Sequence, residues 1–293
     1  MRPSLRLSKQ KTSPWIARQN RDPYVKKRTS GPANYRSRSA FKLLEIDDQY
    51  GRFLTKPDVN AVVDLGAAPG GWSQVVAAKL GYVDDHMPIS ADSREKPNMR
   101  KSAGRDTVTF DPLNIDNVPL DAGGSSNGKG TVIAVDLLRM QPIPGVEFLQ
   151  ADFLAPTTME MLRALLMKRD GSSDGLVDVV LSDMAANASG NDTRDVESSL
   201  EICSAVFEFA ERHLRTAESI GRTKGGVLLM KHFTHPTLQQ FRKEKLEPIF
   251  NEVRFVKPPS SRTESREGFF LCRGYKGSHC SFNHSHVIQS DTI

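Results

Sequence analysis

Short apolar runs recur along the chain, separated by segments in which apolar and polar residues are mixed. Apolar runs of about four to eight residues bounded by Gly, Pro, Asn, Asp or Ser are typical of buried strands. Seven such runs predict strands at 62–65, 131–136, 146–153, 176–184, 225–231, 253–256 and 268–275. Apolar residues at helical spacing predict helices at 36–50, 74–80, 157–168, 195–215 and 237–246. This alternation predicts an open α/β sheet, in which ligands bind beyond the carboxyl ends of the strands.

Three segments fall outside this pattern. Residues 1–33 are polar and basic, residues 277–293 form a polar tail, and residues from about 81 to 130 are dominated by Asp, Ser, Asn, Pro and Gly. We expect the segment at 81–130 to be a long, partly disordered insertion. A chain of 293 residues can bury one large core, so we expect a single domain at 34–276 with a tail on either side.

A glycine-rich corner follows the first predicted strand. The sequence Asp-Leu-Gly-Ala-Ala-Pro-Gly-Gly-Trp-Ser at 64–73 leads directly into a predicted helix. Gly66, Gly70 and Gly71 allow the backbone to approach a ligand closely because they carry no Cβ. The spacing lacks the third glycine of a dinucleotide fingerprint, and no basic residue is present for a phosphate. The narrow, apolar corner therefore favours an uncharged adenosine-type ligand, and an ordinary tight turn is the alternative.

Ionisable residues stand at the ends of several predicted strands. Asp136 and Asp152 follow the second and third strands, and Asp183 follows the fourth. An acid at the second strand tip is typical of a ribose-binding site, and the next one is placed to read the adenine amino group. One such acid alone is more often a solvated strand end, whereas two at successive tips favour a nucleoside pocket. Lys231 ends the apolar fifth strand, an uncommon position because burial disfavours a charged ammonium.

The composition indicates a class of binding partner and a cellular compartment. The net charge of +5 and the pI near 9.1 are compatible with a polyanionic partner. The hydrophobic fraction is 38%, the mean hydropathy is −0.43, and no apolar run approaches the roughly 20 residues of a membrane span. Cys203, Cys272 and Cys280 form no C-x-x-C pair, which favours a reduced intracellular compartment. Histidines and a cysteine at 279–286 do not match common zinc spacings, so we expect no metal.

The N-terminal segment is strongly basic. Residues 1–28 contain nine Lys or Arg residues and a single acid, Asp22. An Arg-rich, acid-poor N-terminus is typical of an organelle transit peptide. A flexible arm that binds nucleic-acid phosphates and a solubilising tail are the alternatives.

Taken together, the motifs resemble those of the FtsJ/RrmJ-type ribose 2'-O-methyltransferases, most of all the branch that acts on large-subunit ribosomal RNA and includes mitochondrial members. The matching motifs occur in the family order at 37–43, 64–74, 135–138, 150–153, 181–184, 230–231 and 261–267. The resemblance implies a Rossmann-like fold with a single doubly wound, mostly parallel sheet, and S-adenosylmethionine as methyl donor. It implies a catalytic tetrad of Lys42, Asp183, Lys231 and Glu267. The implied cofactor-binding residues are Gly66, Pro69, Gly70, Gly71, Trp72, Asp136, Asp152, Phe153 and Asp183.

The resemblance also implies a substrate. We expect methylation of a ribose 2'-hydroxyl, of a uridine, in large-subunit ribosomal RNA or a pre-ribosomal particle, by a monomer that contributes to ribosome assembly in the mitochondrial matrix. The nucleus and the cytoplasm are alternative locations. A tRNA or mRNA-cap ribose methyltransferase and a non-catalytic RNA-binding assembly factor are alternative functions. The insertion, the turn after Lys231, which lacks an expected glycine, and the histidine-bearing tail depart from the family pattern.

The tetrad suits the chemistry of ribose methylation. A ribose hydroxyl is a poor nucleophile, so the enzyme must align it and remove its proton. Alignment contributes up to ~7–11 kcal/mol, and a general base contributes ~10²–10⁴-fold. Our hypothesis is that Lys231 is the base, Asp183 orients it, and Lys42 with Glu267 positions the ribose and tunes the charge. Lys231 can accept a proton only when neutral, and both partial burial and the nearby Lys42 disfavour its charged form.

Overall fold

The protein is described by a computed structural model that covers residues 22–31, 33–83, 128–169, 175–186 and 189–277. In these ranges seven strands form one sheet in the order β3-β2-β1-β4-β5-β7-β6. The strands are β1 (Ala61–Leu65), β2 (Thr131–Asp136), β3 (Val146–Gln150), β4 (Val179–Ser182), β5 (Val227–Phe233), β6 (Phe250–Val256) and β7 (Glu267–Tyr275). Neighbouring strands are parallel except that β7 runs antiparallel between β5 and β6. The predicted doubly wound, mostly parallel sheet is confirmed.

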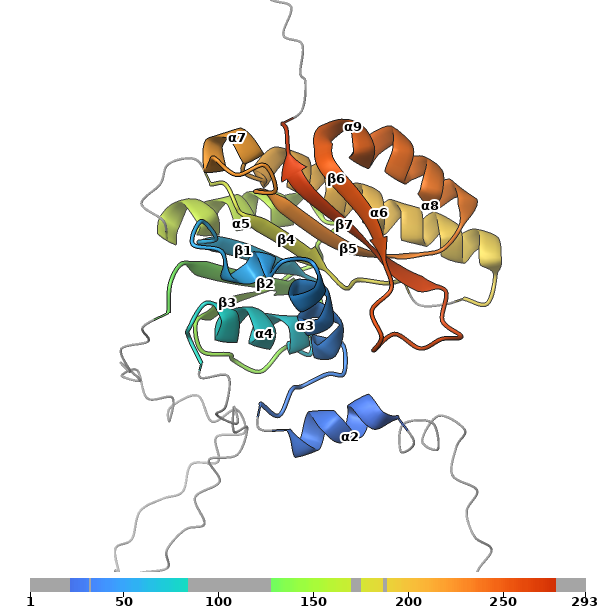
Figure 1. Cartoon of the computed structure of the whole chain (residues 1–293), viewed down its shortest axis with the longest axis horizontal. Helices are drawn as coiled ribbons and strands as arrows, with labels where there is room; N and C mark the ends of the chain where they lie inside the picture. The colour runs from blue at the N-terminus through green and yellow to red at the C-terminus, as the bar shows by residue number, and fades with distance from the viewer. Residues whose placement is uncertain (1–21, 32, 84–127, 170–174, 187–188, 278–293) are drawn as a thin grey trace, which may run out of the picture.

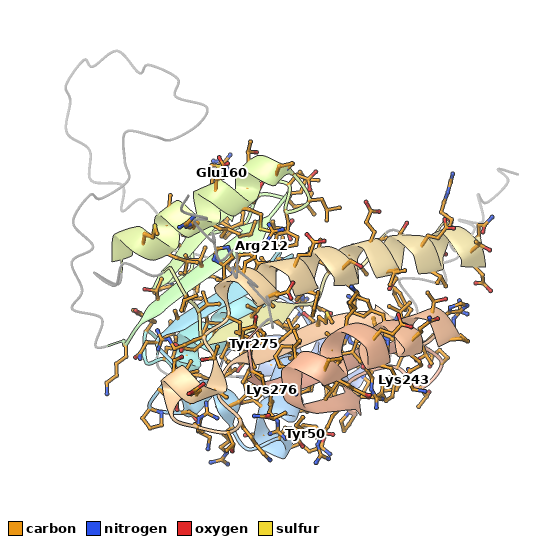
Figure 2. The ribbon with its side chains drawn as sticks, turned by 90° about the horizontal axis from the view of Figure 1, so that it is seen from above. Tyr50, Glu160, Arg212, Lys243, Tyr275 and Lys276 are labelled. Atoms are coloured by element: carbon orange, nitrogen blue, oxygen red, sulfur yellow. The ribbon has the colours of Figure 1, made fainter. Side chains whose placement is uncertain are left out.

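Helices cover both faces of the sheet (Figure 1). The helices in the described ranges are α2 (Pro23–Ser30), α3 (Ala40–Gln49), α4 (Gly71–Lys79), α5 (Pro156–Arg169), α6 (Asp192–His213), α7 (Ala217–Ile220), α8 (Pro236–Phe241) and α9 (Glu247–Ile249), with a 3-10 turn η1 (Phe53–Thr55) and a π-helical turn η2 (Arg242–Leu246). Helices α3 and α4 pack on one face, and α5, α6 and α8 pack on the other. Figure 2 shows α5 and α6 lying across the sheet. Successive strand side chains point to opposite faces, so Val62 joins the α3–α4 side and Val63 the α6 side.

Several element boundaries differ from the sequence prediction, and for β3 and α6 the reason is local. Strand β3 ends at Gln150 because the chain turns at Asp152, whose carboxylate accepts a hydrogen bond from Leu154 N at 3.0 Å. Helix α6 begins at Asp192 because the side chain of Asn191 accepts a hydrogen bond from Arg194 N at 3.2 Å and caps the first turn. The insertion at 81–130 and the tail at 277–293 lie almost entirely outside the described residues. No helix in the described ranges is long and apolar enough to cross a membrane.

The chain packs on the domain from Asp22 onward, earlier than the boundary at residue 33 predicted from composition. Asp22 caps α2 and forms ion pairs with Arg38 and, at 3.3 Å, with Arg262. The Tyr24 ring lies 5.5 Å from that of Phe41, and its hydroxyl donates to the carboxylate of Glu45 at 3.0 Å. The contacts of α2 are therefore made with segments far away in sequence, which composition alone does not reveal.

Candidate active site

The glycine corner joins β1 to α4 and lies against the carboxyl end of β2. Gly66 N and Ala67 N both donate to the carbonyl of Val135, at 2.8 and 3.0 Å. Gly66 and Gly70 have φ of +73° and +109°, values that side chains rarely tolerate. A Cβ on Gly66 would lie 2.1 Å from Cγ of Met184, the residue that follows Asp183. The glycine thus lets the corner contact the tip of β4 directly.

Trp72 is a structural residue of this corner, with a side chain that is only 2% exposed. Its indole N–H donates to the carbonyl of Ser39 at 2.9 Å, and its ring lies 5.7 Å from that of Phe269. A Cβ on the neighbouring Gly71 would lie 2.0 Å from the Ser37 hydroxyl. Both residues therefore join α4 to the start of α3, whereas Pro69 is exposed at the outside of the turn.

Asp136 and Asp152 lie at neighbouring strand tips, as the sequence predicts. The Asp136 carboxylate accepts hydrogen bonds from Ala68 N at 2.8 Å and Leu138 N at 2.7 Å. The backbone carbonyl of Asp136 accepts from Ala151 N at 3.0 Å, which holds the two tips together. An ionised carboxylate offers about four acceptor positions, so Asp136 retains capacity for ligand hydroxyls.

Exposed apolar side chains surround these acids. Leu137 and Leu138 are 65% and 67% exposed, and Leu154 is 47% exposed. Large apolar side chains at a site with hydrogen-bonding carboxylates fit a ligand with a flat apolar body and polar edges. Phe153 does not belong to this surface, since its side chain is buried and lies against Phe209 in the core at 6.1 Å between ring centroids. A cofactor could reach Phe153 only through its backbone.

The four predicted tetrad residues form two lysine–carboxylate pairs. Lys231 Nζ lies 2.9 Å from the Asp183 carboxylate, and Lys42 Nζ lies 2.9 Å from the Glu267 carboxylate. The side chains of the four are 9–17% exposed. The β5–β7 register places Lys231 opposite Phe269, two residues from Glu267, and α3 supplies Lys42 from above that strand pair. The fold therefore gathers these residues from four separate segments.

Burial and the charges of the tetrad lysines together determine the pKa of Glu267. Burial raises the pKa of its carboxyl, but the ammonium of Lys42, its hydrogen bond, and the charge of Lys231 outweigh burial and leave the pKa below its usual value. Glu267 is thus an anion at neutral pH and feels both lysines. The two ion pairs therefore interact electrostatically, and together they offer charged hydrogen-bonding groups to a polar substrate.

Asp64 is a site residue that the sequence reasoning did not single out. It lies within β1, is 1% exposed, and accepts a hydrogen bond from the Ser73 hydroxyl at 2.6 Å. Burial raises its pKa to about 7, the Ser73 hydrogen bond opposes this, and the carboxylates of Asp183 and Asp136 add to the rise. An acid inside an otherwise apolar strand was the available sequence signal. Asp64 therefore lies close enough to both Asp136 and Asp183 for their charges to act on its carboxyl.

Comparison with known proteins decides the family. The sequence matches the FtsJ-like methyltransferases over residues 35–275, which span the glycine corner and all four tetrad residues. The chain belongs to this family. It is 34% identical over 263 residues to ribosomal RNA large subunit methyltransferase E of Coxiella burnetii, covering 90% of this chain and 95% of the relative. It is 35% identical over 263 residues to the protein of the same name from Rhodopseudomonas palustris, covering 90% and 84%.

A solved structure supports the fold independently. The crystal structure of a protein described as a ribosomal RNA methyltransferase from Plasmodium falciparum superposes with a TM-score of 0.56 at 23% identity, covering 83% of this chain and all of that chain. As an FtsJ-like methyltransferase, the protein takes its methyl group from S-adenosylmethionine. The glycine corner, the acids at two strand tips and the exposed leucines beside them fit the nucleoside part of this cofactor. In the described ranges no group of three His, Cys, Asp or Glu side chains could hold a metal ion.

Proposed function

We propose that this methyltransferase modifies a ribose 2'-hydroxyl of a uridine in large-subunit ribosomal RNA. The names of its relatives supply the substrate class. The observation that carries the reaction is the pairing of Lys231 with Asp183 and of Lys42 with Glu267 at one edge of the sheet, next to the glycine corner. This arrangement offers a potential base, an orienting carboxylate and a second pair for the sugar.

In this proposal the tetrad residues have different roles in the reaction. S-adenosylmethionine supplies a methyl group that is already activated by the sulfonium charge. Asp183 holds Nζ of Lys231 through its carboxylate at 2.9 Å, so the lysine is aimed before the RNA arrives. In this proposal Lys231 accepts the proton of the ribose hydroxyl as the general base. Lys42 and Glu267 hydrogen-bond to the ribose and fix its orientation.

The test is methyl transfer to a large-subunit ribosomal RNA transcript, followed by digestion to nucleosides. We expect 2'-O-methyluridine as the product. A transcript with 2'-deoxyuridine at the mapped position should accept no methyl group there, because the nucleophile is missing. A base-methylated nucleoside, or unchanged methylation of the deoxy transcript, contradicts a ribose target. Ribose methylation mapped across cellular RNAs in a deletion strain identifies the nucleotide and tests whether ribosomal RNA is the substrate.

We also propose that the enzyme acts as a monomer in the mitochondrial matrix, where it contributes to ribosome assembly. The basic excess of residues 1–28 supports an import signal. Because the chain packs on the domain from Asp22 onward, the sharp test is a pair of fluorescent fusions carrying residues 1–21 or 1–35. Import by both supports a signal in the first 21 residues. A cytosolic location of both fusions and of the full-length protein contradicts it.

A further inference from the structure

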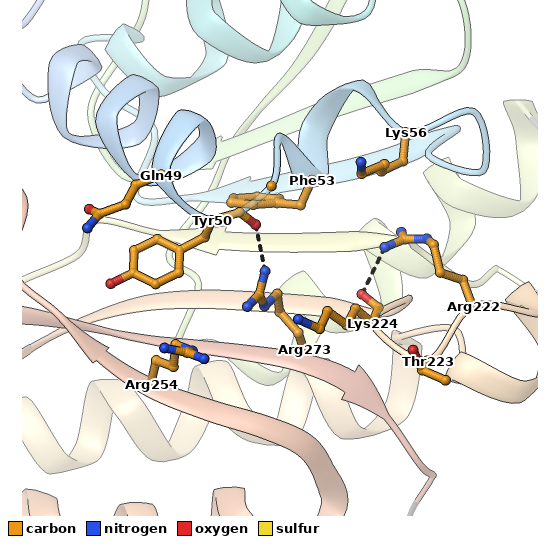
Figure 3. Close-up of a pocket in the computed structure, with 10 residues that line it drawn as sticks. Gln49, Tyr50, Phe53, Lys56, Arg222, Thr223, Lys224, Arg254 and Arg273 are labelled. Carbon is orange, nitrogen blue, oxygen red and sulfur yellow. Dashed lines mark hydrogen bonds between the residues drawn. The ribbon is translucent and has the colours of Figure 1, made fainter.

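A second basic site lies at the edge of the sheet opposite the tetrad. A cavity of about 660 Å³ opens between the end of α3, the loop at 222–224 and the β6–β7 pair (Figure 3). Five of its ten lining residues are cationic and none is acidic: Lys56, Arg222, Lys224, Arg254 and Arg273. The carboxylates that pair with these cations belong to Asp58 and Glu252, which do not line the cavity. Five positive and two negative charges leave a net charge of +3 (5 − 2 = 3).

The floor of this cavity contains a buried, hydrogen-bonded arginine. Arg273 is 6% exposed and donates hydrogen bonds to the Tyr50 carbonyl at 2.5 Å and to the Glu252 carboxylate at 2.6 Å. Its Nε has no hydrogen-bond partner among the described residues. The guanidinium groups of Arg254 and Arg273 lie 5.9 and 5.8 Å from the centre of the Tyr50 ring. The half-buried ring of Tyr50 and the buried Arg273 thus lie side by side in the wall of the cavity, as Figure 3 shows.

More exposed cations surround this floor. Lys224 and Arg254 have side chains that are each 55% exposed, and both pair with Glu252 behind the cavity. The Lys56 carbonyl accepts a hydrogen bond from Val59 N at 3.0 Å, whereas its side-chain ammonium has no hydrogen-bond or ion-pair partner among the described residues. Pairs this exposed contribute little to stability, so these cations exchange partners with little loss when an anion enters.

The position of the cavity relates it to the active site. Helix α3 and strand β7 lie side by side, with Lys42 bound to Glu267 at one end and Tyr50 bound to Arg273 at the other. The two ends are eight helical residues apart on α3, about 12 Å, and six strand residues apart on β7, about 20 Å. A stacked nucleic-acid strand advances about 3.4 Å per nucleotide. The cavity therefore lies roughly four to six nucleotides from the tetrad.

We infer that this cavity binds the phosphodiester backbone of the RNA strand, four to six nucleotides away from the methylated ribose. The lysines and arginines neutralise phosphates, and the Tyr50 ring offers a face on which a base can stack. The inference rests on the proposed function because it names RNA as the ligand. It adds a docking site outside the catalytic cleft, which selects RNA that continues beyond the target nucleotide.

The experiment combines a charge-removing variant with RNA length. Lys56→Gln, Lys224→Gln and Arg254→Gln together remove three cations from the cavity, the half-buried Lys56 and the exposed Lys224 and Arg254, leaving Arg273 and Arg222 in place. The control variant carries Arg212→Gln, Lys243→Gln and Lys245→Gln, which remove three exposed charges on the α6 and η2 side of the molecule (Figure 2). Dissociation constants are measured with the wild type and both variants, for RNA that extends ten nucleotides on either side of the target and for RNA that extends two.

Three lost phosphate contacts should reduce the slope of log affinity against log salt by about 2, which is up to ~100-fold in affinity at 0.1 M salt. We expect this loss for the long RNA with the cavity variant alone, while the short RNA binds wild type and variant alike. Equal losses for both RNAs, or equal losses for both variants, overturn the inference. Uridine monophosphate and inorganic phosphate serve as separate probes of the cavity. If either binds the wild type as tightly as the long RNA does, the ligand is a small phosphate compound and the inference is wrong.

Methyl transfer by the wild type to the long RNA is followed in parallel. Absence of transfer contradicts the proposed function, whereas the length-dependent loss of binding tests the cavity by itself. S-adenosylmethionine affinity of the cavity variant, measured by calorimetry, checks that its fold is intact.

Discussion

Lys231 is the residue whose replacement tests the proposed chemistry most directly. Its Nζ lies 2.9 Å from the Asp183 carboxylate, and the two side chains are 12% and 17% exposed. Lys231→Ala leaves Asp183 within reach of water, so we expect a stability loss of only about 1–3 kcal/mol. Cofactor and RNA binding should remain nearly intact, because Lys231 lies outside the nucleoside pocket. The loss should fall on the chemical step, by at least ~10²-fold or about 2.7 kcal/mol.

Lys231→Arg distinguishes a base from a structural cation. An arginine keeps the positive charge and can pair with Asp183, but its guanidinium stays protonated and cannot accept the hydroxyl proton. The assay is single-turnover methyl transfer with saturating S-adenosylmethionine and ribosomal RNA, with Lys243→Ala as a control at an exposed lysine. We expect both Lys231 variants to fail and the control to match the wild type. An arginine variant within about tenfold of wild type would refute the assignment of Lys231 as the base.

Three further predictions test other parts of the site. Asp136→Ala should weaken S-adenosylmethionine binding roughly 10- to 100-fold, the value of a charge-assisted hydrogen bond of about 1.5–3 kcal/mol; unchanged affinity by calorimetry removes Asp136 from the pocket. Asp64 has a pKa of about 7 in the folded protein, against an ordinary value of 3.8, so the folded state binds this proton more tightly than the unfolded state does. The contribution of Asp64 to the free energy of unfolding therefore falls as the pH rises between those two values. Asp64→Asn should therefore flatten the fall in urea-unfolding free energy between pH 4 and 7, by roughly 4 kcal/mol in total, and an unaltered pH profile contradicts the burial argument. Tyr24→Ala should detach α2 and speed amide hydrogen exchange in residues 23–30, whereas Tyr24→Phe, which keeps the ring against Phe41 but loses the bond to Glu45, should have a smaller effect; equal exchange in the alanine variant and the wild type would show that α2 is held by other contacts.

Much of the fold and of the site could be predicted because their signals are local. The central strands are largely apolar, and the acids or lysine near their ends mark the carboxyl edge where Asp136, Asp183 and Lys231 lie. The sheet and the family are confirmed. The roles of individual residues stay predictions, although the structure brings all four tetrad residues into two pairs.

Features set by long-range packing could not be predicted. Asp22 belongs to a basic segment in the sequence but is buried between Arg38 and Arg262, which are 16 and 240 residues away. Phe153 extends an apolar strand pattern, yet the turn at Asp152 directs its side chain into the core. Arg273 is hidden in the middle of an apolar run, and only the pairing of β6 with β7 shows that it meets Glu252. In each case the partner, and not the local pattern, determines the environment.

The place of β7 in the sheet has a consequence for biosynthesis. Strand β7 is the last strand among the described residues, yet it is not an edge strand, since it lies between β5 and β6 and also supplies Glu267. Until a ribosome has released the chain to about Tyr275, β5 has an unpaired edge and Lys42 lacks its carboxylate partner. A nascent or prematurely terminated chain that lacks β7 therefore exposes an open strand edge, which is prone to aggregation.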